Sequence, residues 1–502
     1  MRPLETLLVL ANGLTFVVIT VPRLRAIRWM RHSAPITLLI VVVQVLGEGR
    51  RWQMIPAYVL TGIVLLVWLV QNTVRAGRPA GQKRPKRRTV GLAVGTGVLG
   101  LAVSIVLPIL IPVFRFPHPR GSYEIGTLTY HWVDADRPEI FSADPHARRE
   151  LMVQIWYPAT SDPSLPRAPY VQDADDLAQA LARLINVPKF IFGHVQYVTT
   201  NAIPVAPVAA DEINYPVLIF LEGAIGFRQM NTFQVEELVS HGYIVVAIDQ
   251  PYTAATVVFP DGHQTAGLSV EQIRALVRPS YIPQDRAPVL NGVALEGGSI
   301  IPYLAHDVSF TLDQLAAFNQ ADPNRILTGR LDLTRVGIFG VSLGGIVGGE
   351  VCQRDSRVRA CLVMDAPMPT VVVQAGLRQP SMWITRDVET MRLERQRAGG
   401  WPEDEIQSHQ TTMRATFETL QGDGYFVQIP GMFHVNLTDV PSWSPLLSRL
   451  GVTGPIDGQR AHTIINAYSV AFFDRHLKGR PAPLLDGSAD QYPDVIFETH
   501  RP

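Results

Sequence analysis

The sequence predicts an α/β domain with a mostly parallel sheet, preceded by an α-helical transmembrane region. After residue 120, short β-branched runs alternate with helical periods, which is typical of a parallel sheet covered by helices. Before that point lie long apolar segments, and 47% of the 502 residues are hydrophobic. A chain of this length holds two or more structural units. We therefore expect a membrane region over residues 1–115 and a folded α/β domain over residues 116–502.

Four apolar segments are expected to form the membrane region, at residues 4–21, 34–46, 54–70 and 90–114. A helix needs about 20 apolar residues to cross a bilayer. The second segment is the shortest, so three spans are an alternative to four. Cleavage of the first segment as a signal peptide is disfavoured, because its basic residues follow the apolar run and further apolar segments come after it.

The charge distribution predicts which side of the membrane each loop occupies. Residues 1–90 hold 14 of the 44 basic side chains and two of the 44 acidic ones. Basic residues remain in the cytoplasm, and here they follow the first and third segments: Arg23, Arg25, Arg28, Arg31, Arg75, Arg78, Lys83, Arg84, Lys86, Arg87 and Arg88. Four spans then place both termini and the large domain on the extracytoplasmic side of a multi-pass protein, which we expect in a bacterial cell membrane. The large domain is acidic, which argues against a nucleic-acid partner.

Seven strands are predicted in the α/β domain, several of them continuously apolar, as strands buried on both faces should be. They are residues 151–158, 217–223, 243–249, 335–340, 360–365, 381–386 and 425–430. Helical patterns cover residues 231–242, 306–322 and 464–479, the first ending at Gly242 and the last at Gly479, both residues suited to a helix C-cap. Residues 252–302 do not fit this alternation, and a long insert of this kind is usually functional. We interpret it as a possible cap, with a plain surface excursion as the alternative.

The two cysteines, Cys352 and Cys361, are too few for a disulfide scaffold or a structural zinc site. Each is interpreted as a buried small hydrophobe. A single disulfide between them is the alternative if the domain is exported.

A nucleophilic serine is predicted at Ser342. The stretch from Gly340 to Gly344 has the G-x-S-x-G pattern, in which the serine stands on a tight turn between a strand and a helix. The two glycines allow that turn because side chains would not fit there. A strand pattern precedes the motif and a helix rich in small residues follows it, as the turn requires.

A histidine base and an acidic partner should follow the serine, because the order along the chain in this arrangement is Ser, acid, His. Among the downstream histidines, His434 lies in a loop just after a predicted strand, whereas His409 and His476 lie in helical patterns. Asp365 ends one predicted strand and Asp387 follows another, so both should lie at the carboxyl edge of the sheet, where ligands bind. Periodicity does not choose between these two acids.

An oxyanion hole needs backbone N–H groups directed at the developing negative charge. The residue after the serine, Leu343, supplies one. The loop after the strand at 217–223 should supply the other, with Gly223 making the turn and Ala224 donating.

These residues resemble the plasma and intracellular type II platelet-activating factor acetylhydrolases, within the α/β-hydrolase superfamily. The resemblance covers roughly residues 120–480 and includes the elbow around Ser342, the strand ending at Asp365 and the loop with His434. It implies an α/β-hydrolase fold, and it implies that Asp365, not Asp387, is the acid. It also implies oxyanion donors at Ala224 and Leu343.

The sequence departs from this family in the oxyanion loop, where Glu222 precedes Gly223 and the family has histidine. An ionised carboxylate pointing at the oxyanion site would oppose its charge. The side chain is expected either to point away or to pair with a cation such as Arg228.

The resulting hypothesis is a membrane-anchored serine ester hydrolase acting on short-chain or oxidised-acyl esters, including lipid esters. It needs no metal and no organic cofactor, and its partners are the ester substrate and the bilayer. Two alternatives remain, an acyltransferase using the same three residues and a non-catalytic membrane receptor. The sequence does not fix the oligomeric state.

Overall fold

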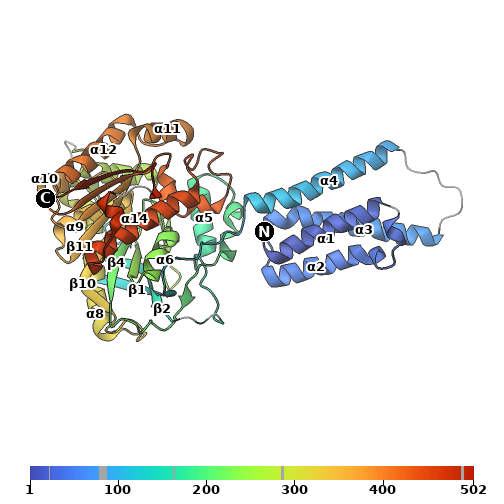
Figure 1. Ribbon diagram of the computed structural model, residues 1–502, viewed down its shortest axis with the longest axis horizontal. Helices are drawn as coiled ribbons and strands as arrows, with labels where there is room; N and C mark the ends of the chain where they lie inside the picture. Colours follow the sequence, from blue (N-terminus) through green and yellow to red (C-terminus); the bar gives the residue numbers. More distant parts are fainter. Residues whose placement is uncertain are drawn as a thin grey trace. The chain divides into compact units, whose positions relative to one another are not determined.

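The computed structural model describes residues 1–21, 23–77, 87–160, 162, 164–283, 288–487 and 491–501 (Figure 1). The chain divides into two compact units. The first comprises Met1–Phe114 with Trp443–Pro445, and the second Arg115–Ser442 with Leu446–Pro502. Each unit is described by itself below.

Among the described residues of the N-terminal unit, four α-helices pack against one another: α1 (Pro3–Thr20), α2 (Ser33–Glu48), α3 (Ile55–Gly77) and α4 (Arg87–Leu110). All four are long and apolar enough to cross a membrane by length and composition. The second apolar stretch runs from Met30 to Glu48 and is 19 residues long, longer than the 34–46 segment read from the sequence. The basic residues Arg78, Lys83, Arg84 and Lys86 lie outside the described residues.

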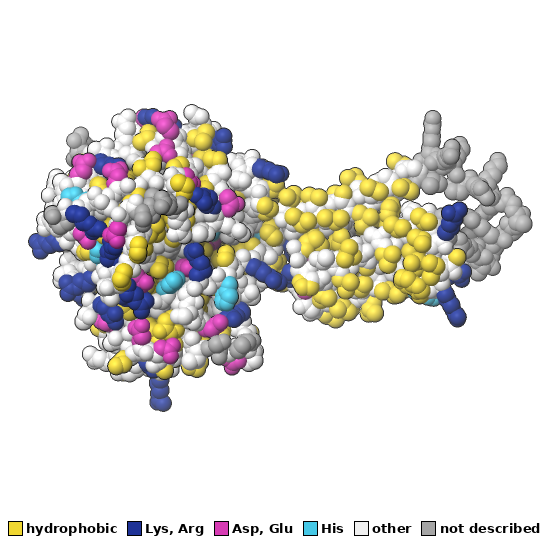
Figure 2. Space-filling model, viewed as in Figure 1, with side chains coloured by type: hydrophobic (Ala, Val, Ile, Leu, Met, Phe, Trp, Pro, Cys, Tyr) yellow, Lys and Arg dark blue, Asp and Glu magenta, His cyan; other side chains and the backbone are white. Residues whose placement is uncertain are grey.

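Several polar side chains of this unit are buried. Glu5 is buried and accepts two hydrogen bonds from the Arg51 guanidinium, at 2.6 and 2.7 Å. The Asn12 amide contacts Thr61 at 3.0 Å, and the Thr15 and Thr37 hydroxyls are 2.9 Å apart. Apolar side chains cover the outside instead (Figure 2), among them the exposed Leu10, Leu46, Leu66, Leu92 and Leu99. Exposed apolar surface of this extent is unusual for a helical bundle in water.

A ten-stranded sheet forms the centre of the second unit, in the order β14-β13-β12-β11-β10-β4-β5-β2-β1-β3. Its middle is a parallel block: β4 (Tyr215–Leu221), β5 (Ile244–Asp249), β10 (Leu331–Val341), β11 (Val358–Met364), β12 (Ser381–Thr385) and β13 (Gly424–Gln428). The remaining strands lie toward its two edges: β1 (Glu124–Pro138), β2 (Arg148–Ala159), β3 (Ile203–Pro204) and β14 (Ile496–His500). The mostly parallel sheet expected from the sequence is confirmed.

Helices cover both faces of this sheet. On one face α8 (Ile301–Ala321) packs on α9 (Leu343–Arg354) over residues such as Ile338 of β10. On the other, α6 (Thr232–Ser240) packs on α14 (Gly458–Lys478), and the Phe339 ring lies 6.2 Å from that of Phe473. Successive β10 residues therefore point to opposite layers, as strand geometry requires.

The other helices of this unit are α5 (Ala174–Leu184), α7 (Val270–Val277), α10 (Thr370–Ala375), α11 (Val388–Ala398), α12 (Glu403–Glu418) and the short α13 (Val440–Trp443). The 252–302 insert has secondary structure of its own: α7 and two small hairpins, β6 (Thr256–Val258) with β7 (Gln264–Ala266), and β8 (Val289–Leu290) with β9 (Val293–Ala294). Within it, residues 284–287 are outside the described residues.

Cys352 of α9 and Cys361 of β11 form a disulfide with Cα atoms 6.4 Å apart. Of the two sequence interpretations, the structure therefore supports the disulfide. The bond ties the helix that follows Ser342 to the strand that precedes Asp365.

Candidate active site

Ser342 lies on a sharp turn between β10 and α9. Its backbone has φ +56° and ψ −120°, a strained conformation for a residue other than glycine. A Cβ atom on Gly340 would lie 2.4 Å from the Gly344 carbonyl, and one on Gly344 would lie 2.2 Å from the Leu221 oxygen. Both positions therefore require glycine, which is the physical basis of the motif.

Asp365 and His434 are in direct contact. His434 opens a short 3-10 helix after β13, and its Nδ1 lies 2.6 Å from Asp365 Oδ2. Asp365 directly follows β11 and also accepts hydrogen bonds from Thr385 Oγ1 at 3.0 Å and Arg386 Nε at 2.7 Å. Burial alone would raise the pKa of Asp365, but the Arg386 charge and two neighbouring histidines hold it well below its usual range. The carboxyl is thus an anion oriented toward His434.

Asp387, the other acid considered, has a different place in the structure. It is the N-cap of α11, where its carboxylate accepts from the Thr390 backbone N–H at 2.8 Å and from Thr390 Oγ1 at 2.7 Å. Such contacts satisfy the free N–H groups of a helix start. The two acids that sequence periodicity left equal are therefore distinguished by their partners.

Three side chains around Asp365 were not singled out by sequence reasoning. His409, on α12 as its helical pattern predicts, is buried with Nε2 3.4 Å from Asp365 Oδ1. The Trp401 ring lies 4.6 Å from the His409 ring and 5.0 Å from the His434 ring, and the Arg386 guanidinium is 5.1 Å from it. These contacts join residues far apart in the sequence, and no local pattern marks them.

The residues expected to form the oxyanion hole lie beside Ser342. A Cβ on Gly223 would be 3.3 Å from Ser342 Cβ, so the loop after β4 passes close to the serine. Leu343 is the first residue of α9, where a backbone N–H has no acceptor within the helix. Ile225 donates to the Thr253 carbonyl at 2.6 Å. Among the described residues no acceptor is found for the Ala224 N–H, which leaves it available.

Ser342 and His434 line one cavity of about 210 Å³. Ala224, Leu343 and Trp401 also line it, and the 252–302 insert contributes Val270, Ile273, Arg274, Val277 and Tyr281. Most of this lining is apolar. In the described part of the chain no hydrogen bond joins Ser342 Oγ to His434, and such bonds often tighten only when substrate is bound.

One expectation was that Glu222 pairs with Arg228. Among the described residues it does not. The Arg228 backbone N–H donates to Asp249 at 2.6 Å and its guanidinium forms an ion pair with the same carboxyl. Glu222 is buried, and its Oε1 accepts from the Gln250 N–H at 3.0 Å.

Comparison with known proteins places these observations in a class. Residues 112–275 match the sequence model of the family described as platelet-activating factor acetylhydrolase, isoform II. A platelet-activating factor acetylhydrolase of Cavia porcellus is 23% identical over 408 residues, covering 76% of this chain and 80% of the relative. A probable 1-alkyl-2-acetylglycerophosphocholine esterase of Arthroderma benhamiae is 22% identical, covering 81% of this chain and 99% of the relative. Among solved structures, a ferulic acid esterase from Streptomyces cinnamoneus is 28% identical with a TM-score of 0.58, covering 77% of this chain and 99% of that one.

The fold and these relatives define a carboxylic ester hydrolase with the α/β-hydrolase fold. Within this class, the resemblance to the platelet-activating factor acetylhydrolases found in the sequence is confirmed.

Proposed function

We propose that Ser342, His434 and Asp365 are the catalytic triad of this ester hydrolase. The observation that carries the proposal is the 2.6 Å contact between Asp365 and His434, in the same cavity as the strained Ser342 turn. His434 removes the Ser342 proton while Oγ attacks the ester carbonyl carbon, and Asp365 orients the imidazole and stabilises its charged form.

The negative oxygen of the tetrahedral intermediate is held by the Ala224 and Leu343 N–H groups. When this intermediate collapses, the bond to the alcohol oxygen breaks and His434 returns the proton to the leaving alcohol. His434 then deprotonates a water that attacks the acyl-enzyme, which releases the carboxylic acid and restores Ser342.

The substrate we propose is an ester with a short or oxidised acyl chain, carried by a lipid or another lipophilic alcohol. The small, largely apolar cavity supports a limited acyl group. One relative is named platelet-activating factor acetylhydrolase and another probable 1-alkyl-2-acetylglycerophosphocholine esterase, and both names contain an acetyl group. The four apolar helices support an anchor that holds the domain at a bilayer, where lipid esters are concentrated.

The test is hydrolysis of p-nitrophenyl esters, from acetate to decanoate, by detergent-solubilised protein. We expect activity on the short esters and a loss of about 10³-fold or more in kcat for Ser342→Ala. Ser381→Ala, at a buried serine of β12, is the matched control and should retain activity.

Activity that Ser342→Ala leaves unchanged would contradict the proposed triad. Product that forms only when an acceptor alcohol is added would assign the same residues to an acyltransferase instead.

A further inference from the structure

The carboxyl of Glu222 lies at the start of the oxyanion loop, and in the part of the chain that the structure describes it belongs to no ion pair. Glu222 follows β4, and Asp249 ends the neighbouring parallel strand β5, so two buried carboxyls lie side by side. Arg228 faces this pair. The Arg228 backbone N–H donates to Asp249, and the Arg228 guanidinium forms an ion pair with the same carboxyl. Within the described residues Glu222 makes no ion pair, and its Oε2 has no hydrogen-bond partner.

A buried carboxylate without a cation is unstable relative to its protonated form. Burial, and after it the neighbouring Asp249 carboxyl, raise the pKa of Glu222 well above its usual range. The hydrogen bond from the Gln250 N–H and the Arg228 charge lower the pKa but offset only part of this rise. Asp173 adds to the negative potential around Asp249. It therefore does not counteract the rise in the pKa of Glu222. Burial and the absence of an ion pair within the described residues therefore favour the protonated form of Glu222 over the ionised one.

The loop that Glu222 opens is fastened to the turn after β5 by three contacts. Glu222 Oε1 accepts from the Gln250 N–H at 3.0 Å. The Ile225 N–H donates to the Thr253 carbonyl at 2.6 Å, and the Ala255 N–H donates to the Gly226 carbonyl at 2.8 Å. Ala224 lies between these attachment points, so they determine the direction of its N–H.

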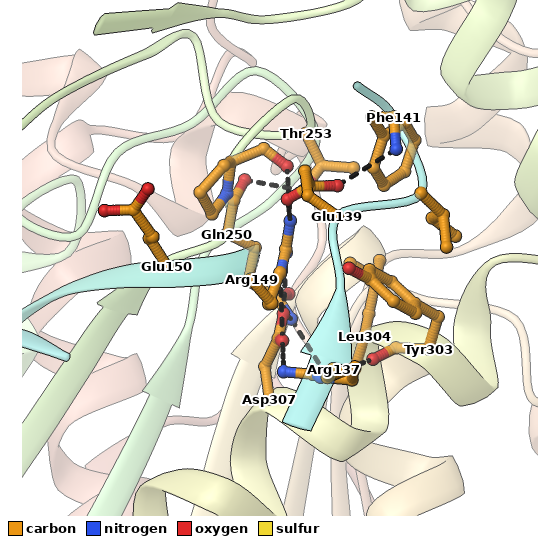
Figure 3. Close-up of polar contacts among 12 residues, drawn as sticks. Arg137, Glu139, Phe141, Arg149, Glu150, Gln250, Thr253, Tyr303, Leu304 and Asp307 are labelled. Carbon is orange, nitrogen blue, oxygen red and sulfur yellow. Dashed lines mark hydrogen bonds and ion pairs between the residues drawn. The ribbon is translucent and has the colours of Figure 1, made fainter. Parts of the chain in front are cut away.

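Gln250 is itself fixed by a buried ion cluster (Figure 3). Its side-chain amide donates to Asp307 Oδ2 at 2.8 Å and to the Leu304 carbonyl at 2.9 Å. Asp307 is held in turn by Arg149, at 2.7 and 3.0 Å, and by Arg137. Arg149 is fully buried and its second carboxylate partner is Glu139, at 2.8 Å. The turn that receives Glu222 thus has little freedom to move.

We propose that Glu222 is a positioning residue, a neutral carboxylic acid that holds the oxyanion loop so that the Ala224 N–H points at the developing oxyanion. This proposal rests on the function proposed above. Neutrality explains why a glutamate is tolerated there, because an uncharged carboxyl does not oppose the negative charge of the intermediate. The Gln250 contact supplies the positioning.

The kinetic test compares Glu222→Gln with Glu222→Ala on p-nitrophenyl acetate. Glutamine is neutral and keeps an oxygen for the Gln250 N–H, so we expect its kcat within about threefold of the wild type. Alanine releases the loop, so its kcat should fall about 10- to 100-fold with KM nearly unchanged, a fraction of the loss caused by deleting an oxyanion donor. Glu236→Gln, at a buried glutamate of α6 bonded to Asn201, is the matched control and should leave kcat unchanged.

A spectroscopic test does not depend on activity or on the alanine variant folding. The infrared spectrum of the wild type should contain a protonated-carboxyl C=O band that is missing from Glu222→Gln at neutral pH. Absence of that difference band would overturn the proposed neutral state.

Two kinetic outcomes would also overturn the proposal: Glu222→Gln as impaired as Glu222→Ala, or Glu222→Ala with wild-type kcat. Both outcomes are measured on the ester-hydrolase activity that Ser342→Ala abolishes. Failure of the proposed function, by contrast, would be seen as wild-type activity that is absent or insensitive to Ser342.

Discussion

At the scale of single residues, the structure distinguishes residues that have the same sequence context, because their contact partners at the sheet edge differ. Asp365 and Asp387 each follow a predicted strand, yet one contacts His434 and the other caps α11. Ser342, His434 and the two glycines of the elbow could be predicted because a local pattern marks them. His409, Trp401 and the buried environment of Glu222 could not, because their roles depend on partners brought together only by folding.

The two aspartates provide a matched test of the proposed triad. In Asp365→Asn the anion that orients His434 is lost, so we expect kcat to fall by about 10²- to 10⁴-fold. Asparagine is as good a helix cap as aspartate, so Asp387→Asn should retain both activity and stability. The measurement is kcat on p-nitrophenyl acetate for both variants. A larger loss for Asp387→Asn would assign the acid to that residue instead.

His462 on α14 predicts a pH dependence of stability. It is buried, its Nε2 lies 2.8 Å from the Thr438 carbonyl, and its ring stacks on Phe233. Burial lowers the pKa of His462 from 6.5 to about 4. Between these values the unfolded chain binds a proton that the folded chain does not. The contribution of neutral His462 to the free energy of unfolding is therefore fully present above pH 6.5. It is lost as pH falls toward 4, by up to about 3 kcal/mol.

Thermal unfolding from pH 4 to 8 would measure this contribution. His462→Gln should have a shallower loss of Tm on acidification than the wild type, whereas His146→Gln, at an exposed histidine, should parallel the wild type. Parallel curves for His462→Gln and the wild type would show that His462 does not titrate in this range.

At the scale of elements, prediction succeeded where strands are buried on both faces. The seven strands expected from apolar runs correspond to β2, β4, β5 and β10–β13. β1 was not predicted because its second half, toward Pro138, is mostly polar and partly exposed, and β14 because none of its five residues is fully buried. The insert at residues 252–302, for which a cap and a plain surface excursion were both considered, contains α7, and α7 contributes to the cavity wall.

The junction of β10 with α9 predicts opposite effects for two glycines of one helix. A Cβ in Gly344→Ala would lie 2.2 Å from the Leu221 oxygen and 2.6 Å from the Glu222 oxygen. The backbone must shift, so we expect a loss of about 1–3 kcal/mol in unfolding free energy together with most of the activity. In Gly348→Ala the nearest atoms are Ile338 side-chain carbons at 3.9 Å. That variant should be unchanged or more stable, by about 0.5–1 kcal/mol, because alanine favours helix.

Denaturant unfolding and ester hydrolysis of both glycine variants would test this difference. Equal stability and activity in the two variants would show that the helix can move away from β4 without harm to the site.

At the scale of the whole molecule, composition separated a membrane-like region from an α/β domain because the two expose different surfaces. The N-terminal helices have apolar side chains outside and the Glu5–Arg51 pair inside, whereas the second unit keeps its apolar residues in the sheet and under its helices. The only acidic residues in the sequence from 1 to 90 are Glu5 and Glu48. The sequence did not reveal that Glu5 is buried against Arg51. That pairing is consistent with a structural role, because ionisable groups within membrane regions are usually paired.

The last prediction concerns sidedness. Basic residues follow the first and third apolar helices, so if these helices cross a membrane the basic loops should remain in the cytoplasm. The Cys352–Cys361 disulfide is typical of an oxidising compartment. A cysteine introduced at the exposed Glu418 should therefore react with a membrane-impermeant maleimide in intact cells. One introduced at the exposed Arg28, in the first loop, should react only after permeabilisation. The reverse pattern would place the large domain in the cytoplasm, and equal labelling of both sites would mean an even number of spans between Arg28 and that domain.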